Sequence, residues 1–355
     1  MKKFIIIALS IIFISCNKND DNIAPNPVIN ESLQDILDAH QGNKSIPGLS
    51  SAVYFYEGDS IWTGVAGNSH ADISINSEML FGIASNTKLF TAVLCLKLQE
   101  QGMLNLDSSI HHFLPSIEYV DPNITVRQLL KHESGVFDYT TNPAFLPAVL
   151  NDLSHFWTPE EILQYINAPI FEPGTSSGYS DTNYILAGMI LESVSGKTYE
   201  ELLELYIFTP LNLQHTYVGW SETEGETFAH PWEDFSDILS NYSTSIFSSF
   251  WAAGCIVSTP KEMASWYHNL FNGNVLNPSS LAELSDFSTW DFGLGIIRMY
   301  DEGNEYWVHP GAAPGYSSVF IYDVSCKNSV ILMENDSYKL SLSNLAFKLA
   351  KNACK

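Results

Sequence analysis

The sequence has 355 residues, 45% of them hydrophobic and 13% aromatic, and its formal net charge is −24. This length is ample for a packed core and exceeds what one core usually reaches, so two lobes are expected. The acidity argues against binding nucleic acid or docking electrostatically on anionic lipid, because both need patches of Lys and Arg. Solubility alone accounts for such a charge, with selection for cationic substrates as the alternative.

The first 27 residues have the pattern of an export signal followed by a tether. A basic start, Met1-Lys2-Lys3, precedes an apolar run over 4–14 that is too short to span a membrane. Ser15-Cys16 and a polar stretch follow, which resembles a bacterial lipoprotein signal, although Phe13 replaces the usual Leu. We therefore expect an exported protein, anchored at the periplasmic or outer cell surface by lipid on Cys16. Plain secretion is the alternative.

Strands are predicted near the two ends of the chain, each with one helix, and mostly helices are predicted in the middle. A helix over 29–41 and a hairpin of strands 51–57 and 60–65 come first, and a hairpin of strands 316–323 and 329–334 with a helix over 338–353 comes last. The chain ends therefore predict one sheet lobe, built from 28–107 and 290–355. The stretch 108–289 has mostly helical patterns and predicts a helical lobe.

The cysteines beyond Cys16 divide into two kinds. Cys95 and Cys255 lie in apolar runs and are expected to be buried thiols. Cys326 lies in the turn of the last hairpin, and the closing helix runs back along that hairpin, which brings Cys354 toward the same turn. A disulfide between Cys326 and Cys354 is compatible with an exported protein, and the sequence leaves both outcomes open.

The pattern Ser-x-x-Lys occurs three times, beginning at Ser15, Ser85 and Ser258. The first crosses the predicted signal, and the third has a Pro before its Lys and is typical of a helix start. Ser85 instead follows an apolar, strand-like segment and opens the helix predicted over 87–101. At that position backbone N–H groups are free to bind an oxyanion, and Lys88 lies on the same helix face. A helix-capping role for Ser85 is the alternative.

Two further segments favour catalysis. Gly178-Tyr179-Ser180-Asp181-Thr182-Asn183-Tyr184 precedes a helix, and Trp307-Val308-His309-Pro310-Gly311-Ala312 precedes a strand. The sequence resembles the serine beta-lactamase-related family, which contains class C beta-lactamases, D-Ala-D-Ala carboxypeptidases, D-aminopeptidases and esterases. The resemblance rests on three motifs in the family's order: Ser-x-x-Lys at Ser85, a variant of Tyr-x-Asn at Tyr179, and His-x-Gly at His309. The resemblance extends over about 28–350. It implies an α+β fold of the beta-lactamase/penicillin-binding-protein type, with an antiparallel sheet flanked by helices and a helical second lobe.

The resemblance also implies roles for individual residues. Ser85 would attack the substrate carbonyl, Lys88 would accept its proton and Tyr179 would pass a proton to the leaving group, with a nearby cation needed to make the phenol useful at neutral pH. His309 and Gly311 belong to the third motif, and the N–H groups of Ser85 and Ala312 would form the oxyanion hole. Such acyl-enzyme chemistry needs no cofactor and no metal.

Two positions depart from the family pattern. Asp181 stands where the family usually has Asn, and a carboxylate can accept but not donate a hydrogen bond. Near Lys88 it would hold the lysine charged, with an attraction of about 4 kcal/mol at 4 Å and an effective dielectric of 20. Either Asp181 turns away and Asn183 assists, or the site prefers substrates without the usual amide contact, such as cationic amines. Pro310 removes the hydroxyl and N–H that help hold a substrate carboxylate.

The predicted function is therefore an exported serine hydrolase acting on small ester, amide or short D-amino-acid peptide substrates. Beta-lactamase or D-Ala-D-Ala carboxypeptidase activity is one alternative, and a catalytically silent binding protein on the same fold is another. Two other patterns carry less weight. Ser176 lies in a Gly-x-Ser-x-Gly match without the preceding strand, and His111-His112 and His132-Glu133 lack a metal-ligand spacing.

Overall fold

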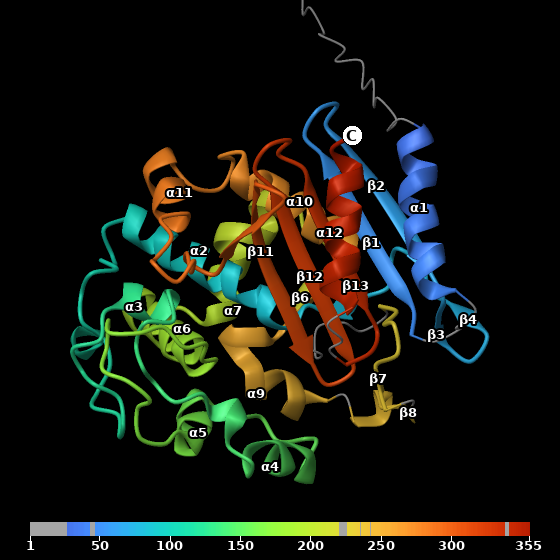
Figure 1. Cartoon of the computed structure of the whole chain (residues 1–355). Coiled ribbons are helices and arrows are strands. Elements are labelled where there is room, and N and C mark those ends of the chain that lie inside the picture. Colours follow the sequence, from blue (N-terminus) through green and yellow to red (C-terminus); the bar gives the residue numbers. More distant parts are fainter. Residues whose placement is uncertain (1–26, 43–46, 220–225, 235, 242, 338–340) are drawn as a thin grey trace, which may run out of the picture.

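The computed structural model describes residues 27–42, 47–219, 226–234, 236–241, 243–337 and 341–355 (Figure 1). The predicted signal segment, with Cys16, lies outside the described residues. Within the described part of the chain, no helix is both long enough and apolar enough to cross a membrane.

The central layer is a six-stranded antiparallel sheet built from the two ends of the chain. Its strand order is β10-β11-β12-β13-β1-β2. Both predicted hairpins are present, and the ends meet where Leu49 of β1 pairs with Glu334 of β13. The strands are β1 (Leu49–Phe55), β2 (Ser60–Ala66), β10 (Ile297–Asp301), β11 (Asn304–Ala313), β12 (Tyr316–Asp323) and β13 (Ser329–Glu334).

The two terminal helices, α1 (Pro27–Gln41) and α12 (Ser341–Ala353), cover one face of this sheet (Figure 1). Their apolar residues, including Leu33, Leu37 and Leu345, recur at helical spacing and form a buried cluster with sheet residues such as Val330. The helix α10 (Pro260–Phe271) packs on the opposite face, against β1 and β13. The three central strands, β12, β13 and β1, are therefore buried on both faces, whereas the outer strands β2 and β10 remain partly exposed.

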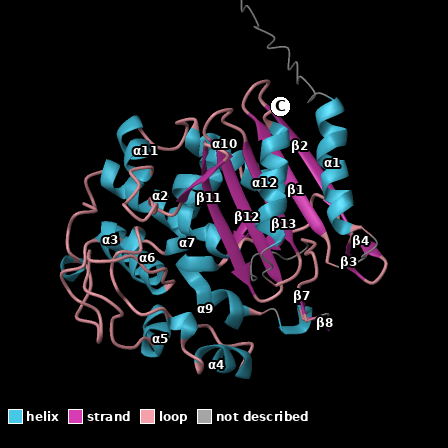
Figure 2. Ribbon diagram, viewed as in Figure 1, coloured by secondary structure: helices cyan, strands magenta, loops and turns pink. Residues whose placement is uncertain are grey.

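The middle of the chain forms a helical region beside the sheet (Figure 2). Capping boxes begin three of its helices, because Thr125, Thr158 and Thr198 each accept from a backbone N–H three residues on. The helices are α2 (Thr87–Glu100), α3 (Val126–Leu130), α4 (Phe145–Asn151), α5 (Pro159–Ile162), α6 (Thr182–Ser195), α7 (Tyr199–Leu203), α8 (Thr209–Leu211), α9 (Thr244–Gly254) and α11 (Pro278–Leu284).

Two features of the helical region lie outside the sequence patterns described above. The helix α2, which lies in the stretch 28–107, packs against α6 and α9. A second small sheet, β5-β9-β6, joins Phe81–Gly82, Ile256–Ser258 and Thr216–Val218. These strands have two or three residues each, too few for a sequence period to be recognised. Short pairs also form between β3 (Asn68–His70) and β4 (Ile73–Ser74), and between β7 (Trp232–Glu233) and β8 (Ser236–Asp237).

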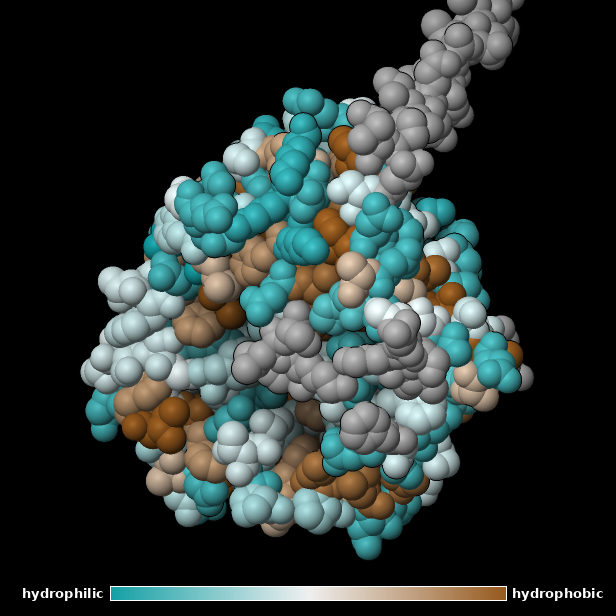
Figure 3. All heavy atoms as spheres, turned by 45° about the vertical axis from the view of Figure 1, so that its right-hand side comes forward, coloured by the Kyte–Doolittle hydropathy of each residue, from teal (hydrophilic) through white to brown (hydrophobic). Residues whose placement is uncertain are grey.

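The closing helix is tied covalently to the sheet. Cys326 and Cys354 form a disulfide, with their Cα atoms 5.9 Å apart, at the turn between β12 and β13. Cys95 and Cys255 are free, buried thiols. The face of the molecule in Figure 3 carries many hydrophilic side chains, with hydrophobic ones gathered in a few smaller patches between them.

Candidate active site

Ser85 lies in a tight 3₁₀ turn, Ala84–Asn86, between β5 and the start of α2. The residue before the turn is bonded to β9, because the Ile83 N–H donates to the Ile256 carbonyl at 3.0 Å. Ala84, directly before the serine, has a φ of +48°, in the left-handed region that residues with a Cβ rarely adopt. Such backbone strain is concentrated at functional sites, where the surroundings maintain it.

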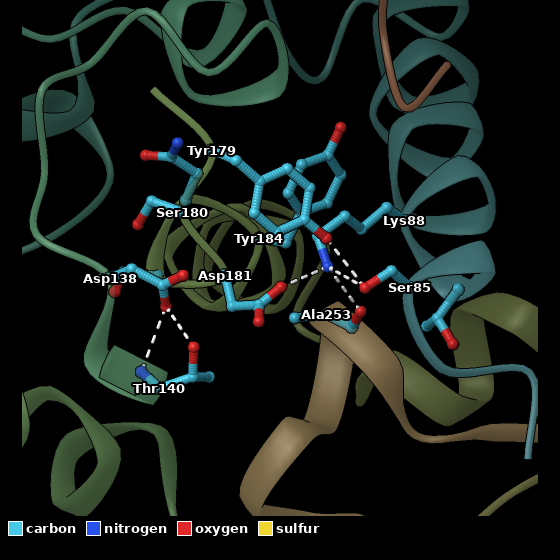
Figure 4. Close-up of polar contacts among 12 residues, drawn as sticks. Ser85, Lys88, Asp138, Thr140, Tyr179, Ser180, Asp181, Tyr184 and Ala253 are labelled. Carbon is cyan, nitrogen blue, oxygen red and sulfur yellow. Dashed lines mark hydrogen bonds and ion pairs between the residues drawn. The ribbon is translucent and has the colours of Figure 1, made fainter. Parts of the chain in front are cut away.

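The side chain of Lys88 is fully buried one helical turn after Ser85. Its Nζ lies 3.1 Å from Ser85 Oγ and 2.9 Å from the Ala253 carbonyl, and it makes an ion pair with Asp181 (Figure 4). These three acceptors match the three N–H donors of a lysine ammonium group. The site thus holds a buried cation next to the serine oxygen, balanced by one carboxylate.

Tyr179 closes the other side of the serine. Its hydroxyl donates to Ser85 Oγ at 2.8 Å. Tyr179 is 39% exposed, but its hydroxyl faces the interior of the site, where desolvation and the Asp181 carboxylate raise the pKa of the phenol well above its usual value. Tyr179 is therefore a protonated donor at rest, although the sequence argument anticipated that a cation would activate it. The ammonium of Lys88 lies 5.0 Å from the Tyr179 ring centre but does not offset this effect.

His132 supports Tyr179 from behind. Its imidazole stacks on the Tyr179 ring with centroids 4.5 Å apart, and its Nδ1 accepts from the Ser180 N–H at 3.2 Å. Burial and the nearby charge of Lys88 lower the pKa of His132 well below its usual value, so the ring is neutral with its proton on Nε2. The sequence offered His132 only as part of an unconvincing metal pattern, and its spacing from Tyr179 gave no signal of this contact.

The third motif lies on β11, where this strand becomes a free edge. Pairing between β10 and β11 ends at Val308, so His309 and the residues after it pair only with β12. Pro310 is tolerated there because no neighbouring strand needs its N–H. Gly311 faces the turn that carries Ser85, since a Cβ on it would lie 2.5 Å from the Ile83 carbonyl oxygen. Ala312 follows it and is exposed.

His309 is buried and neutral. Its Nδ1 lies 2.7 Å from the Pro310 carbonyl and donates to it, and its ring centre is 6.3 Å from that of Tyr179. Burial and the charge of Lys88 lower the pKa of His309 to about 3. It therefore cannot replace the cationic lysine found at this position in beta-lactamases.

The ambiguity at the second motif is resolved in favour of Asp181, which points to Lys88. The alternative in which Asp181 turns away and Asn183 assists is wrong, because Asn183 is fully buried and bonded elsewhere. Its side chain accepts from Ser134 Oγ at 2.5 Å and contacts His132 Nδ1 at 3.2 Å. The Asn183 side chain is therefore engaged with Ser134 and His132.

A second carboxylate, Asp138, lies beside Asp181 (Figure 4). Its Oδ1 accepts from the backbone N–H and the hydroxyl of Thr140, at 3.1 and 2.9 Å. Burial and the negative charge of Asp181 raise the pKa of Asp138 to about 6. Sequence reasoning missed this residue, since an Asp before a short turn is usually only a cap.

The weaker sequence patterns lie away from this centre. Ser176 is in a loop with no strand before it, and Ser258 ends β9 with its hydroxyl 2.8 Å from that of Thr216. His111 and His112 contact backbone carbonyls at 3.0 Å each. Within the described ranges, the one cluster with metal-ligand spacing is Asp323, Cys326 and Cys354, and its two sulfurs form the disulfide.

A serine oxygen held between a buried lysine and a tyrosine, at a turn that opens a helix beside a sheet edge, is the arrangement of a serine hydrolase. Fold and site together define that class. The Beta-lactamase family profile matches residues 33–354, and the chain belongs to that family.

Three known proteins illustrate the relationship. The chain is 24% identical to penicillin-binding protein 4* of Bacillus subtilis over 306 residues, 78% of this chain but only 65% of that protein. Among solved structures, the D-stereospecific amidohydrolase of a Streptomyces species has a TM-score of 0.78 and 28% identity, covering 90% of this chain and 97% of that one. The D-amino acid amidase of Ochrobactrum anthropi has a TM-score of 0.79 and 27% identity, covering 92% and 97%.

Proposed function

We propose that the protein is an exported serine hydrolase that cleaves small amides or esters bearing a free ammonium group, with D-amino-acid amides as the favoured class. One observation carries the proposal. Ser85 Oγ lies 3.1 Å from Lys88 Nζ and 2.8 Å from the Tyr179 hydroxyl, and two carboxylates lie beyond Lys88. This arrangement combines an activated nucleophile with a local excess of negative charge.

Lys88 must give up one of its own protons before it can accept the proton of Ser85. Ser85 can transfer its proton to Lys88 only as Lys88 gives one of its own protons to the Asp181 carboxylate in contact with it. The Lys88–Asp181 pair has no net charge before this transfer. After Lys88 has also taken up the serine proton, the pair carries one positive charge, which stabilises the negative charge forming on the substrate oxygen.

The remaining steps follow from the geometry around the serine oxygen. Ser85 Oγ bonds to the substrate carbonyl carbon, and the backbone N–H groups of Ser85 and Ala312 stabilise the oxyanion. Tyr179, protonated at rest, gives its proton to the departing amine and regains one from the Lys88–Asp181 pair. Water then hydrolyses the Ser85 ester and releases the acid.

Asp138 is the group that favours a cationic substrate. Among the described residues, Asp138 makes no ion pair, whereas Asp181 is balanced by Lys88. A substrate ammonium would supply the missing cation and favour the ionised form of Asp138. On the opposite side, Pro310 offers neither hydroxyl nor N–H to a substrate carboxylate, and His309 is neutral. These features favour amides and esters over peptides ending in a free carboxylate.

The relatives support the same substrate class. Two structures that cover nearly the whole chain are described as a D-stereospecific amidohydrolase and a D-amino acid amidase. Export and lipid anchoring rest on the sequence around Cys16. They are tested by fatty-acid labelling of cells that produce the protein, which a Cys16→Ala variant should abolish.

The central experiment combines active-site labelling with a substrate panel. A fluorophosphonate should add one adduct to the intact protein, absent in Ser85→Ala and retained in Ser176→Ala, a serine in the decoy motif. The panel compares D- and L-phenylalanine amide, their N-acetyl derivatives, matching esters, a D-Ala-D-Ala peptide and a cephalosporin. We expect turnover of the free-amine D-amide to exceed that of its N-acetyl form. Preferred turnover of the cephalosporin or the D-Ala-D-Ala peptide contradicts the substrate proposal, and no adduct with any probe favours a silent binding protein.

A further inference from the structure

Three buried side chains link the nucleophile turn to the sheet. The Tyr267 hydroxyl of α10 donates to Asn86 Oδ1 at 2.8 Å, and Asn86 Nδ2 donates to Ser318 Oγ at 2.8 Å. Ser318 Oγ in turn donates to the Ile83 carbonyl at 2.8 Å. Tyr267, Asn86 and Ser318 are each at most 1% exposed. We call these three side chains the polar bridge.

The polar bridge lies directly under β11. A Cβ on Gly311 would lie 2.3 Å from Ser318 Oγ and 3.2 Å from Asn86 Nδ2, so only a hydrogen atom fits between the strand and the bridge. Contacts this close fix the distance between two backbones, because neither can approach further and the hydrogen bonds oppose separation.

The position of the polar bridge in the sequence relates it to catalysis. Asn86 directly follows Ser85, and Gly311 directly precedes Ala312. Of the two backbone N–H groups assigned to the oxyanion hole, one therefore belongs to the residue before Asn86, and the other to the residue after Gly311, which contacts the bridge. Donors to an oxyanion act only when they are fixed at about 2.7–3.1 Å from the charged oxygen.

We propose that Asn86 and Ser318, with Tyr267 behind them, are positioning residues that set the separation of the Ser85 and Ala312 N–H groups. None of the three side chains touches substrate. This inference rests on the proposed function, since it assumes that those N–H groups bind an oxyanion. The competing view is that the bridge only stabilises the fold, as buried hydrogen bonds do generally.

Ser318→Ala and Ser317→Ala form a matched pair that separates these views. Ser317 is the neighbouring residue of β12, equally buried, and donates to the Asp336 carbonyl at 2.8 Å, away from the bridge. Both variants lose a hydroxyl and one or two buried hydrogen bonds. Only Ser318→Ala loosens the contact between the nucleophile turn and β11.

The measurement is the affinity for a boronic acid, whose tetrahedral adduct on Ser85 puts an oxygen in the oxyanion hole. We expect Ser318→Ala to weaken boronate binding and slow acylation by about 10-fold or more, with KM changed less than about threefold, because misplaced oxyanion donors act on the transition state. Ser317→Ala should leave the boronate affinity and the acylation rate within about threefold of wild type, because it does not displace the oxyanion donors. Tyr267→Phe removes one hydrogen bond and should have a smaller effect in the same direction, which provides a test if Ser318→Ala does not fold.

Two outcomes would overturn the inference. One is unchanged boronate affinity in folded Ser318→Ala and Tyr267→Phe, and the other is an equal loss in Ser317→Ala. These failures differ from failure of the proposed function, in which the wild-type protein itself would form neither a boronate nor a fluorophosphonate adduct.

Discussion

The two sides of Ser85 present different chemical groups to the serine oxygen: side chains on the helical side and backbone groups on the sheet side. On the helical side, charged and polar side chains of Lys88, Tyr179 and Asp181 converge on the serine oxygen. On the sheet side, β11 offers backbone groups only, and the side chain of His309 is neutral and bonded to its own strand. In the proposed mechanism, proton transfer and amine recognition therefore depend on side chains, whereas oxyanion binding depends on how closely two backbones approach.

This contrast predicts that the sheet side is sensitive to added volume. Gly311→Ala would place a Cβ 2.5 Å from the backbone oxygen of Ile83, which cannot rotate away, so β11 must move from the nucleophile turn. We expect acylation to fall by about 100-fold or more, the cost of losing an oxyanion donor. The rate of fluorophosphonate labelling measures this loss.

Gly303→Ala is the control for Gly311→Ala. Gly303 lies in the turn between β10 and β11, just before the strand that carries Gly311, with a φ of +86° and open space around its Cβ position. Its replacement strains the backbone without changing the site, so it should lower the melting temperature but leave labelling nearly unchanged. Equal labelling rates in the two variants would mean that the close approach at Gly311 is not needed for activity.

The helical side should respond to loss of charge instead. Asp181→Asn removes the acceptor for the Lys88 proton, so Lys88 must then lose a proton to solvent before it can act as a base. Since acid–base catalysis contributes about 10²–10⁴-fold, we expect acylation to drop by about 100-fold at pH 6 and to recover as pH rises. Wild-type acylation should vary much less with pH over this range.

The pH profile of acylation separates this role from a simple loss of an ion pair. Asp286→Asn breaks the Lys131–Asp286 pair, whose atoms are 3.2 Å apart, without touching the site, and should keep the wild-type profile. If Asp181→Asn also keeps the wild-type profile, Asp181 does not carry the proton. If its amide turnover is unchanged too, the departure from Asn has no bearing on substrate choice.

The same contrast explains what the sequence could predict. Both hairpins, both terminal helices and the placement of Ser85 before a helix follow from local patterns, since periodicity and turn residues are properties of neighbouring residues. His132 and Asp138 act on Tyr179 and Asp181 from more than 40 positions away, and no local pattern encodes such contacts. The raised pKa of Tyr179 also depends on desolvation of its hydroxyl and on the Asp181 carboxylate beside it, which only the packed structure reveals.

The smallest predicted effect concerns Asp138 and the pH dependence of substrate binding. Because its pKa is raised to about 6, Asp138 is neutral in acid and becomes charged as pH rises through that value. An α-ammonium group keeps its charge up to about pH 8, so KM for a free-amine amide should fall as pH rises through 6. The KM of the N-acetyl amide should not change over that range. His309, with a pKa of about 3, stays neutral throughout.

Asp138→Asn should remove this pH dependence and raise KM for the free-amine amide by about 10-fold, as expected for loss of one charged partner. Asn keeps an acceptor for Thr140, so the local turn is preserved. Asp152→Asn is the matched control, because Asp152 Oδ1 accepts from the N–H and hydroxyl of Ser154 in the same way, at 3.0 and 2.7 Å, on the surface. If Asp138→Asn, like Asp152→Asn, leaves KM unchanged for the free-amine amide and for the N-acetyl amide, the charge of Asp138 interacts with Lys88 and not with substrate. Recognition of the amine would then have to come from another part of the site.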